Sequence, residues 1–84
     1  MVSVHYFASI REKLALSAEQ LELPLHVTTV SALVDYLVER HGAAWAEVLS
    51  KASVLVAVNQ SVANYSAEIK DGDEIAFFPP VTGG

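Results

Sequence analysis

The chain contains no cysteine among its 84 residues. Disulfides, thiolate catalysis and cysteine-based zinc sites are therefore excluded. Basic residues are also few, because five Lys and Arg stand against ten Asp and Glu, which gives a net charge of −5. An acidic domain repels phosphate backbones, so we expect no nucleic-acid partner. The same charge suits a protein partner with a basic docking surface.

Long apolar runs are missing as well, and none approaches the roughly 20 residues that a membrane-spanning helix needs. The first residues, Met1–Val4, carry no basic region typical of a signal peptide. We therefore expect a cytoplasmic protein without membrane contact. A chain of 84 residues predicts one domain, with little room for both a core and a deep, self-sufficient active site.

Candidate metal and nucleotide sites are sparse. His5, His26 and His41 do not pair with another His, Asp or Glu at a metal-ligand spacing on one element. Asp71-Gly72-Asp73 lacks the further oxygen ligands of a calcium loop and is interpreted as a turn. The four glycines include no phosphate-binding cluster. We expect no metal and no cofactor bound by this chain.

The first third of the chain predicts strand, helix and strand. Residues 2–7 alternate in polarity, as a half-buried strand does. Residues 8–16 are a short helical candidate, and residues 20–23 alternate again until Pro24. On the first strand the face expected to be buried holds Val2, Val4 and Tyr6.

The clearest helix signal follows Thr29, a plausible N-cap. Gly42 stands where a left-handed C-cap would end this helix, and residues 43–50 form a shorter helical candidate. Apolar residues at i, i+3, i+4, i+7 and i+8 make one stripe, which is expected to face the core: Val30, Leu33, Val34, Leu37 and Val38.

The last third predicts three strands. Residues 54–58 are almost continuously apolar, which indicates a central strand buried on both faces. Residues 59–60 are a turn candidate, residues 62–65 a short strand, and residues 74–78 the final strand after the turn at Asp71–Asp73.

This order predicts an α+β fold of the β-grasp type. A mixed sheet of about five strands would carry one main helix across it, with the first and last strands adjacent and central. Residues 1–78 would form the domain and residues 79–84 an extended tail.

The tail combines a stiff base with a slender tip. Pro79-Pro80 cannot continue a β-ladder and holds the backbone extended. Six residues can reach about 20 Å beyond the sheet. Gly83-Gly84 has no side chains and would let a terminal carboxylate enter a narrow channel. Such a segment suits delivery into the active site of another protein.

An aromatic pair is expected near the base of this tail. By alternation, Phe7 and Phe78 lie on adjacent strands and on the sheet face that no helix covers. An exposed aromatic pair indicates a docking patch. The alternative is that one Phe packs into a small local cluster.

Three segments resemble the small subunit of molybdopterin synthase. They are Phe7-Ala8 with Arg11-Glu12, then Ala57-Val58-Asn59-Gln60, and the long C-terminal run from Asp71 to Gly84. The C-terminal run is highly specific, whereas residues 17–53 match only in pattern.

The resemblance implies a sulfur carrier that is not catalytic alone. An activating enzyme would adenylate the Gly84 carboxylate with ATP, and sulfur transfer would give a thiocarboxylate. The tail would then enter the large subunit of a heterotetramer and deliver sulfur to cyclic pyranopterin monophosphate, building the dithiolene. Residues implied for tail insertion are Pro79, Pro80, Val81, Thr82 and Gly83, and those implied for the partner interface are Phe7, Val62, Phe78 and Arg11.

Three alternatives remain open. A thiamin-pathway sulfur carrier shares the fold and the Gly-Gly end, although the segment Phe77–Thr82 argues against it. A protein modifier joined to lysines would use the same terminus as a tag. A plain binding module would not need the tail. For Arg11, the alternative to partner contact is a solvated charge at a helix end.

Overall fold

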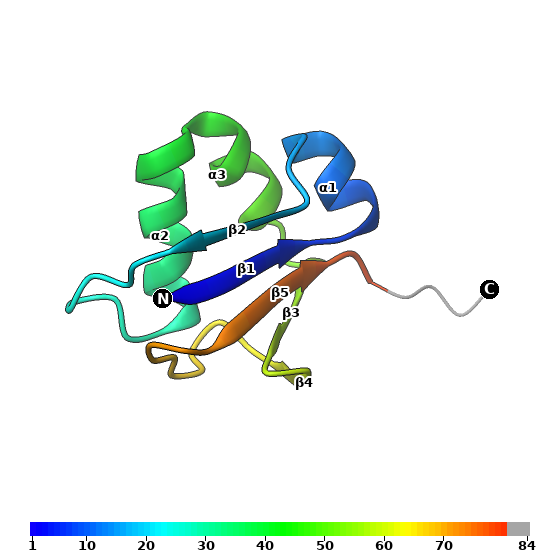
Figure 1. Cartoon of the computed structure of the whole chain (residues 1–84). Helices are drawn as coiled ribbons and strands as arrows, with labels where there is room; N and C mark the ends of the chain where they lie inside the picture. Colours follow the sequence, from blue (N-terminus) through cyan, green and yellow to red (C-terminus); the bar gives the residue numbers. More distant parts are fainter. Residues whose placement is uncertain (81–84) are drawn as a thin grey trace.

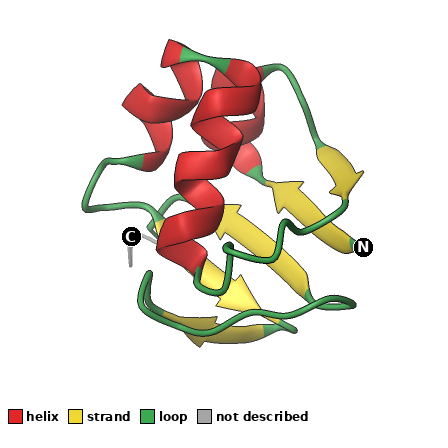
Figure 2. Ribbon diagram, turned by 90° about the vertical axis from the view of Figure 1, so that its left-hand side faces the viewer, coloured by secondary structure: helices red, strands yellow, loops and turns green. Residues whose placement is uncertain are grey.

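The computed structural model describes residues 1–80, which contain five strands and three helices. The helices gather on one side of a single sheet (Figures 1 and 2). In chain order the elements are β1 (Val2–Tyr6), α1 (Ala8–Leu14), β2 (Ala18–Leu21), α2 (Val30–His41), α3 (Ala43–Leu49), β3 (Leu55–Val58), β4 (Ser61–Ala63) and β5 (Glu74–Phe78).

The sheet has the strand order β2-β1-β5-β3-β4. The first and last strands, β1 and β5, are parallel neighbours near its centre, with Tyr6 opposite Phe77. All other neighbouring pairs are antiparallel. The predicted β-grasp fold with a mixed, five-stranded sheet is confirmed.

The core lies between the sheet and the helices. β1 alternates between buried and partly exposed residues, as its polarity pattern predicts. On α2, Leu33 and Leu37 are fully buried, and the Thr29 hydroxyl oxygen accepts a hydrogen bond from the Ala32 N–H at 3.1 Å. This bond satisfies one of the free donors at the helix start. The predicted N-cap and apolar stripe of the main helix are confirmed.

Gly42 ends α2, but not with the left-handed conformation that we expected. Its φ of 101° and ψ of −162° lie in a region essentially restricted to glycine. The Gly42 N–H donates to the Val38 carbonyl at 2.7 Å, and its own carbonyl accepts from Trp45 at 3.1 Å. One residue therefore closes α2 and starts α3, which requires a sharper change of direction than a simple C-cap.

The edges of the sheet differ from the sequence prediction. β2 covers Ala18–Leu21 instead of residues 20–23, because it pairs with β1 through Val2–Leu21 and His5–Ala18. β4 starts one residue earlier than predicted and is shorter. Between β3 and β4, Asn59 and Gln60 have φ of 51° and 69°, the two positive values of a type I′ hairpin turn. That turn was predicted.

β3 lies inside the sheet, between β5 and β4, and its middle is buried on both faces as predicted, although its ends are not. Val56 and Ala57 are buried, whereas Leu55 and Val58 are partly exposed. Val56 and Ala57 are consecutive and so point to opposite faces of the sheet, whereas the two partly exposed residues are the first and last of the strand.

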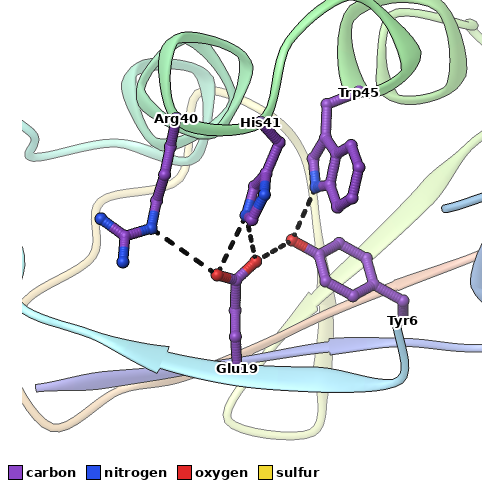
Figure 3. A network of polar contacts seen from close by, with 5 residues as sticks. All are labelled: Tyr6, Glu19, Arg40, His41 and Trp45. Atoms are coloured by element: carbon purple, nitrogen blue, oxygen red, sulfur yellow. Dashed lines mark hydrogen bonds and ion pairs between the residues drawn. The ribbon is translucent and has the colours of Figure 1, made fainter. Parts of the chain in front are cut away.

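A polar network joins the end of α2 and the start of α3 to β1 and the edge strand β2 (Figure 3). The Glu19 carboxylate lies 2.8 Å from His41 Nε2 and accepts a hydrogen bond from the Tyr6 hydroxyl at 2.9 Å. Trp45 Nε1 donates to that hydroxyl oxygen at 3.1 Å, and Arg40 lies 3.9 Å from Glu19. Burial is the main reason that the pKa of Tyr6 is raised. Each member has a partner, so we assign the network to stability.

Candidate functional site: the open sheet face and the base of the tail

The face of the sheet without helices carries an apolar strip that ends where the tail begins. Strand register places His5, Ala76, Ala57 and Val62 in one row across four strands. The next row toward the tail contains Leu55 opposite Phe78 on neighbouring strands. We call the apolar residues of these rows, together with Phe7, the open face: Phe7, Leu55, Ala57, Val62, Ala76 and Phe78.

Phe7 and Phe78 lie side by side on this face. The Phe7 N–H donates to the Phe77 carbonyl at 3.1 Å, which extends the β1–β5 pairing past Tyr6. The Phe7 side chain is 46% exposed, and that of Phe78 is partly exposed. The His5 ring stacks on the Phe7 ring with a centroid distance of 6.2 Å. The expected adjacency of the two aromatic residues is present, and Phe7 is not withdrawn into a buried cluster.

Val62 is the most exposed member of the open face at 74%. It projects from the edge strand β4 on the same face as Ala57, its partner in the register. Leu55 belongs to the same face, but we did not predict it as a site residue. The sequence indicates only that Leu55 and its neighbour Val56 point to opposite faces of the strand. Which of these faces is the open one follows from the register, in which Leu55 lies opposite Phe78.

Arg11 lies on α1, one turn after Phe7, and its N–H reaches the Phe7 carbonyl at 3.3 Å. It is exposed, and it makes no ion pair with any other residue of the described part of the chain. Its position next to Phe7 is compatible with both interpretations, partner contact and solvated charge.

The base of the tail follows β5 directly. Pro79 is partly buried and Pro80 is exposed, and both line a hollow of about 200 Å³ between α1 and the segment that joins α3 to β3. Of the predicted site residues, Val81, Thr82, Gly83 and Gly84 lie outside the described residues. The structure thus places the tail base next to the open face.

The turn before β5 fixes the start of the strand that leads to the tail. Asn59 Nδ2 donates to the Asp73 carboxylate at 2.9 Å, and Asn59 Oδ1 accepts from the Glu74 N–H at 3.0 Å. The Lys70 N–H also donates to Asp73 at 2.9 Å. The hydrogen bond from Asn59 is the main cause that lowers the pKa of Asp73. This turn therefore has a positioning role for β5.

The chemistry available within residues 1–80 is that of binding. No group of three or more His, Asp or Glu side chains in this range is placed to hold a metal ion. None of its helices is long and apolar enough to cross a membrane. What this part of the chain offers is a partly exposed apolar face, a stiff proline pair beside it, and a sheet that holds both in place.

Fold and site together define a protein of the ubiquitin-like β-grasp class that presents an apolar sheet face beside a C-terminal segment. Residues 4–84 match the model of the ThiS family. The molybdopterin synthase sulfur carrier subunit of Haemophilus influenzae is 44% identical over all of both chains. The subunit of the same name from Escherichia coli is 39% identical, again over all of both chains. The chain therefore belongs to the ThiS family, among the molybdopterin synthase sulfur carrier subunits.

Solved structures share the fold. A putative molybdopterin converting factor subunit 1 from Pyrococcus furiosus is 31% identical, with a TM-score of 0.74, over 95% of this chain and 97% of that one. SAMP1, the small archaeal modifier protein 1 of Haloferax volcanii, is 26% identical with a TM-score of 0.77, over 99% and 98%. In Helicobacter pylori, a protein–protein complex of subunits 1 and 2 of molybdopterin-converting factor contains a chain 26% identical, with a TM-score of 0.65, over 99% and 97%.

Proposed function

We propose that this chain carries sulfur on the α-carboxyl group of Gly84 and donates it within a molybdopterin synthase. The observation that carries the proposal is the position of the exposed Phe7 and the partly exposed Phe78 at the point where β5 leads into Pro79-Pro80. A docking face beside a segment that ends in Gly83-Gly84 suits a protein that inserts its terminus into a partner. Membership among the sulfur carrier subunits supports the same function.

The proposed chemistry must first activate the Gly84 carboxylate, because a free carboxylate is a poor electrophile. A carboxylate oxygen of Gly84 attacks the α-phosphorus of ATP in an activating enzyme, and pyrophosphate leaves. A hydrosulfide-equivalent donor then displaces AMP from the acyl-adenylate, which leaves a terminal thiocarboxylate. Its sulfur is a good nucleophile and forms a C–S bond to a side-chain carbon of cyclic pyranopterin monophosphate, while the C–O bond at that carbon breaks and its oxygen leaves as water or as the opened phosphate. A second thiocarboxylate supplies the second sulfur in the same way. Water then cleaves the acyl–sulfur bond, which returns the Gly84 carboxylate and leaves sulfur on the product as part of the dithiolene.

This chain would supply position and not catalytic groups. It has no cysteine to hold sulfur, and its size leaves little room for an enclosed, self-sufficient active site. Catalytic acids and bases would therefore come from the partners. Glycines at the tip make the narrowest possible segment, and the proline pair limits the number of conformations that insertion must select. Holding reactants at the right distance is itself a large part of catalysis.

The proposed partner is the large subunit, in a heterotetramer with two copies of each chain in the cytoplasm. Each small subunit would dock through the apolar residues Phe7, Val62 and Phe78 and insert Pro79–Gly83, with Gly84 at the reacting centre. The paired subunits of the Helicobacter pylori factor support such an assembly. Arg11 would contribute a polar contact beside Phe7, because it lies one helical turn away.

A second candidate function is supported by the likeness to SAMP1, whose name describes a modifier protein. In that case an activated Gly84 carboxylate would acylate a lysine ε-amine and form an isopeptide bond. Both functions need the same activated terminus, so only the acceptor distinguishes them. The thiamin-pathway alternative is weaker, because the curated relatives that match over the full chain are molybdopterin synthase subunits.

The deciding experiment is mass spectrometry of the C-terminus after purification from cells. A thiocarboxylate is heavier than a carboxylate by about 16 Da, since sulfur replaces oxygen. The purified thiocarboxylate form should then convert cyclic pyranopterin monophosphate to molybdopterin when the large subunit is added. Absence of sulfur at the terminus, together with isopeptide-linked adducts, would establish the modifier function instead.

A further inference from the structure

The five basic residues of this acidic chain are unevenly distributed. Arg40 lies 3.9 Å from Glu19, and Lys70 lies 3.5 Å from Asp73, so both have a carboxylate neighbour. The other three are Arg11, Lys13 and Lys51. None of them forms an ion pair with any residue in the range 1–80.

Two of these three residues meet at the base of the tail. Lys13 on α1 and Lys51 just after α3 both line the hollow of about 200 Å³ that also contains Pro79 and Pro80. Ser9 and Ser53 line the same hollow and add two hydroxyl groups. No Asp or Glu of the described residues lines it. Two lysines thus border one hollow without a carboxylate beside them, and a negative charge bound there would be attracted by both.

The position of the hollow limits what that negative charge can be. Gly84 is the fourth residue after Pro80, and an extended chain covers about 13–14 Å over four residues. A nucleotide or pterin phosphate at the reacting carboxylate therefore lies beyond the reach of the hollow when the tail is inserted. What surrounds the tail base during insertion is the rim of the partner protein.

We propose that Lys13 and Lys51 bind a carboxylate side chain, from Asp or Glu, at the rim of the large-subunit channel that takes up the tail. This inference rests on the proposed function, because it requires a partner that receives the tail. The two ammonium groups and the Ser9 and Ser53 hydroxyls supply the donors that a carboxylate accepts.

Such a contact would fix the orientation of docking. The open face lies on one side of the tail base, and it is apolar, so it contributes affinity with little directional preference. The Lys13–Lys51 hollow contacts α1 and α3, on the helix side of the sheet. A partner that suits a net charge of −5 is otherwise basic. A single acidic group on it, matched to Lys13 and Lys51, would disfavour encounters in which the small subunit approaches in a rotated orientation.

The test compares two double variants with the same net charge. Lys13→Gln with Lys51→Gln changes the charge from −5 to −7 by removing two cations. Leu25→Glu with His26→Glu makes the same change in the loop between β2 and α2, at the opposite end of the sheet from the end of β5 (Figure 1). All four positions are exposed, and Leu25 is 99% exposed, so both proteins should keep the parent's melting temperature.

Binding to the purified large subunit is measured by stopped-flow and by titration at about 0.05 M and about 0.5 M salt. The Gln pair should bind about tenfold more weakly at low salt, mainly through slower association, and the difference should shrink at high salt. The remote pair should bind at least as well as the parent. Equal or tighter binding by the Gln pair would overturn the proposal.

A separate readout keeps this result apart from the proposed function. The thiocarboxylate form of the Gln pair, supplied at saturating concentration, should still transfer its sulfur, because Gly84 is unchanged. If the parent protein itself neither binds the large subunit nor transfers sulfur, the proposed function fails. If the parent does both and the Gln pair matches it at low salt, only the carboxylate contact is wrong.

Discussion

The Phe7 N–H donates to the Phe77 carbonyl at 3.1 Å, and this bond sets Phe7 beside Phe78 at the end of the two central strands. Because β1 and β5 are parallel, both strands end at the same edge of the sheet, and the chain continues from there into Pro79. Phe7, Phe78 and the base of the tail are thus held by two paired strands inside the sheet. Movement of one relative to the other would require breaking the β1–β5 ladder.

The aromatic contact gives the first prediction. Phe78→Ala should weaken binding of the large subunit by about 2 kcal/mol or more, or about 30-fold in Kd, as expected for a buried aromatic anchor. The control is Leu25→Ala, which removes a fully exposed side chain far from the tail and should leave Kd unchanged. Isothermal titration measures both. A Phe78→Ala protein with the parent's affinity would eliminate the docking role of the open face while leaving the tail chemistry intact.

The second prediction concerns α2. Leu37 is fully buried between this helix and the sheet, so Leu37→Ala should cost about 2–5 kcal/mol of unfolding free energy. That is a large share of the stability of a small domain. Denaturant titration followed by circular dichroism gives the value. Leu25→Ala again serves as the control, and a loss at Leu37 no larger than in the control would mean that the helix face is misassigned.

Local patterns predicted most of this fold. Alternation over Val2–Tyr6 and the stripe on α2 are properties of neighbouring residues, and both faces were predicted correctly. Errors arose where distant residues decide the outcome. The exposure of Leu55 depends on its register with Phe78, 23 positions later, and the start of β2 depends on pairing with β1.

The site shows the same division. Sequence alone placed Phe7 and Phe78 on one face, because parity within each strand is local. It gave no indication that Lys13 and Lys51 share a hollow, since helix packing brings together positions 38 residues apart. It also missed the network of Glu19 and His41, which joins positions 22 residues apart.

The third prediction is a dependence of stability on pH. Asp73 has a lowered pKa, chiefly because Asn59 donates to its carboxylate. A folded-state pKa below the unfolded value of 3.8 means that the ionised group stabilises the fold above that pH. This contribution is lost as the pH falls through the lower, folded-state pKa. Acid titration of the parent should show part of its stability disappearing below about pH 4.

Asp73→Asn isolates this contribution. The variant should be less stable than the parent at pH 7 by about 1–3 kcal/mol, the size of a hydrogen bond to a charged group. The difference should narrow as the pH falls through the lowered folded-state pKa of Asp73, because the parent's carboxyl then loses its charge as well. Asp35→Asn, an exposed position on α2, should give the parent's profile. A pH-independent difference for Asp73→Asn would show that the loss comes from shape and not from charge.

The fourth prediction separates the chemistry of the tail from the fold. Adding one residue after Gly84 should abolish sulfur transfer, because the former carboxylate becomes an amide and the new one overshoots the reacting centre. Gly83→Val should fail for a different reason, since a β-branched side chain does not fit a channel shaped for glycine. Neither change touches the core, so both proteins should melt at the parent's temperature. Product formation with purified partners is the assay.

Deletion of Gly84 is the sharpest of these tests because it changes only distance. Gly83 then carries a terminal carboxylate with nearly the same intrinsic reactivity, but the terminus is shorter by about 3.3–3.6 Å. A misplacement of 1 Å can already lower a rate by about 100-fold, so turnover should fall to background. The mass of the C-terminus after incubation with ATP, the activating enzyme and a sulfur source tells whether the shortened chain fails to acquire sulfur or fails to transfer it. If the shortened chain still acquires sulfur and supports full turnover, the mechanism does not depend on the depth of the Gly84 carboxylate, and the proposed role of the tail is wrong.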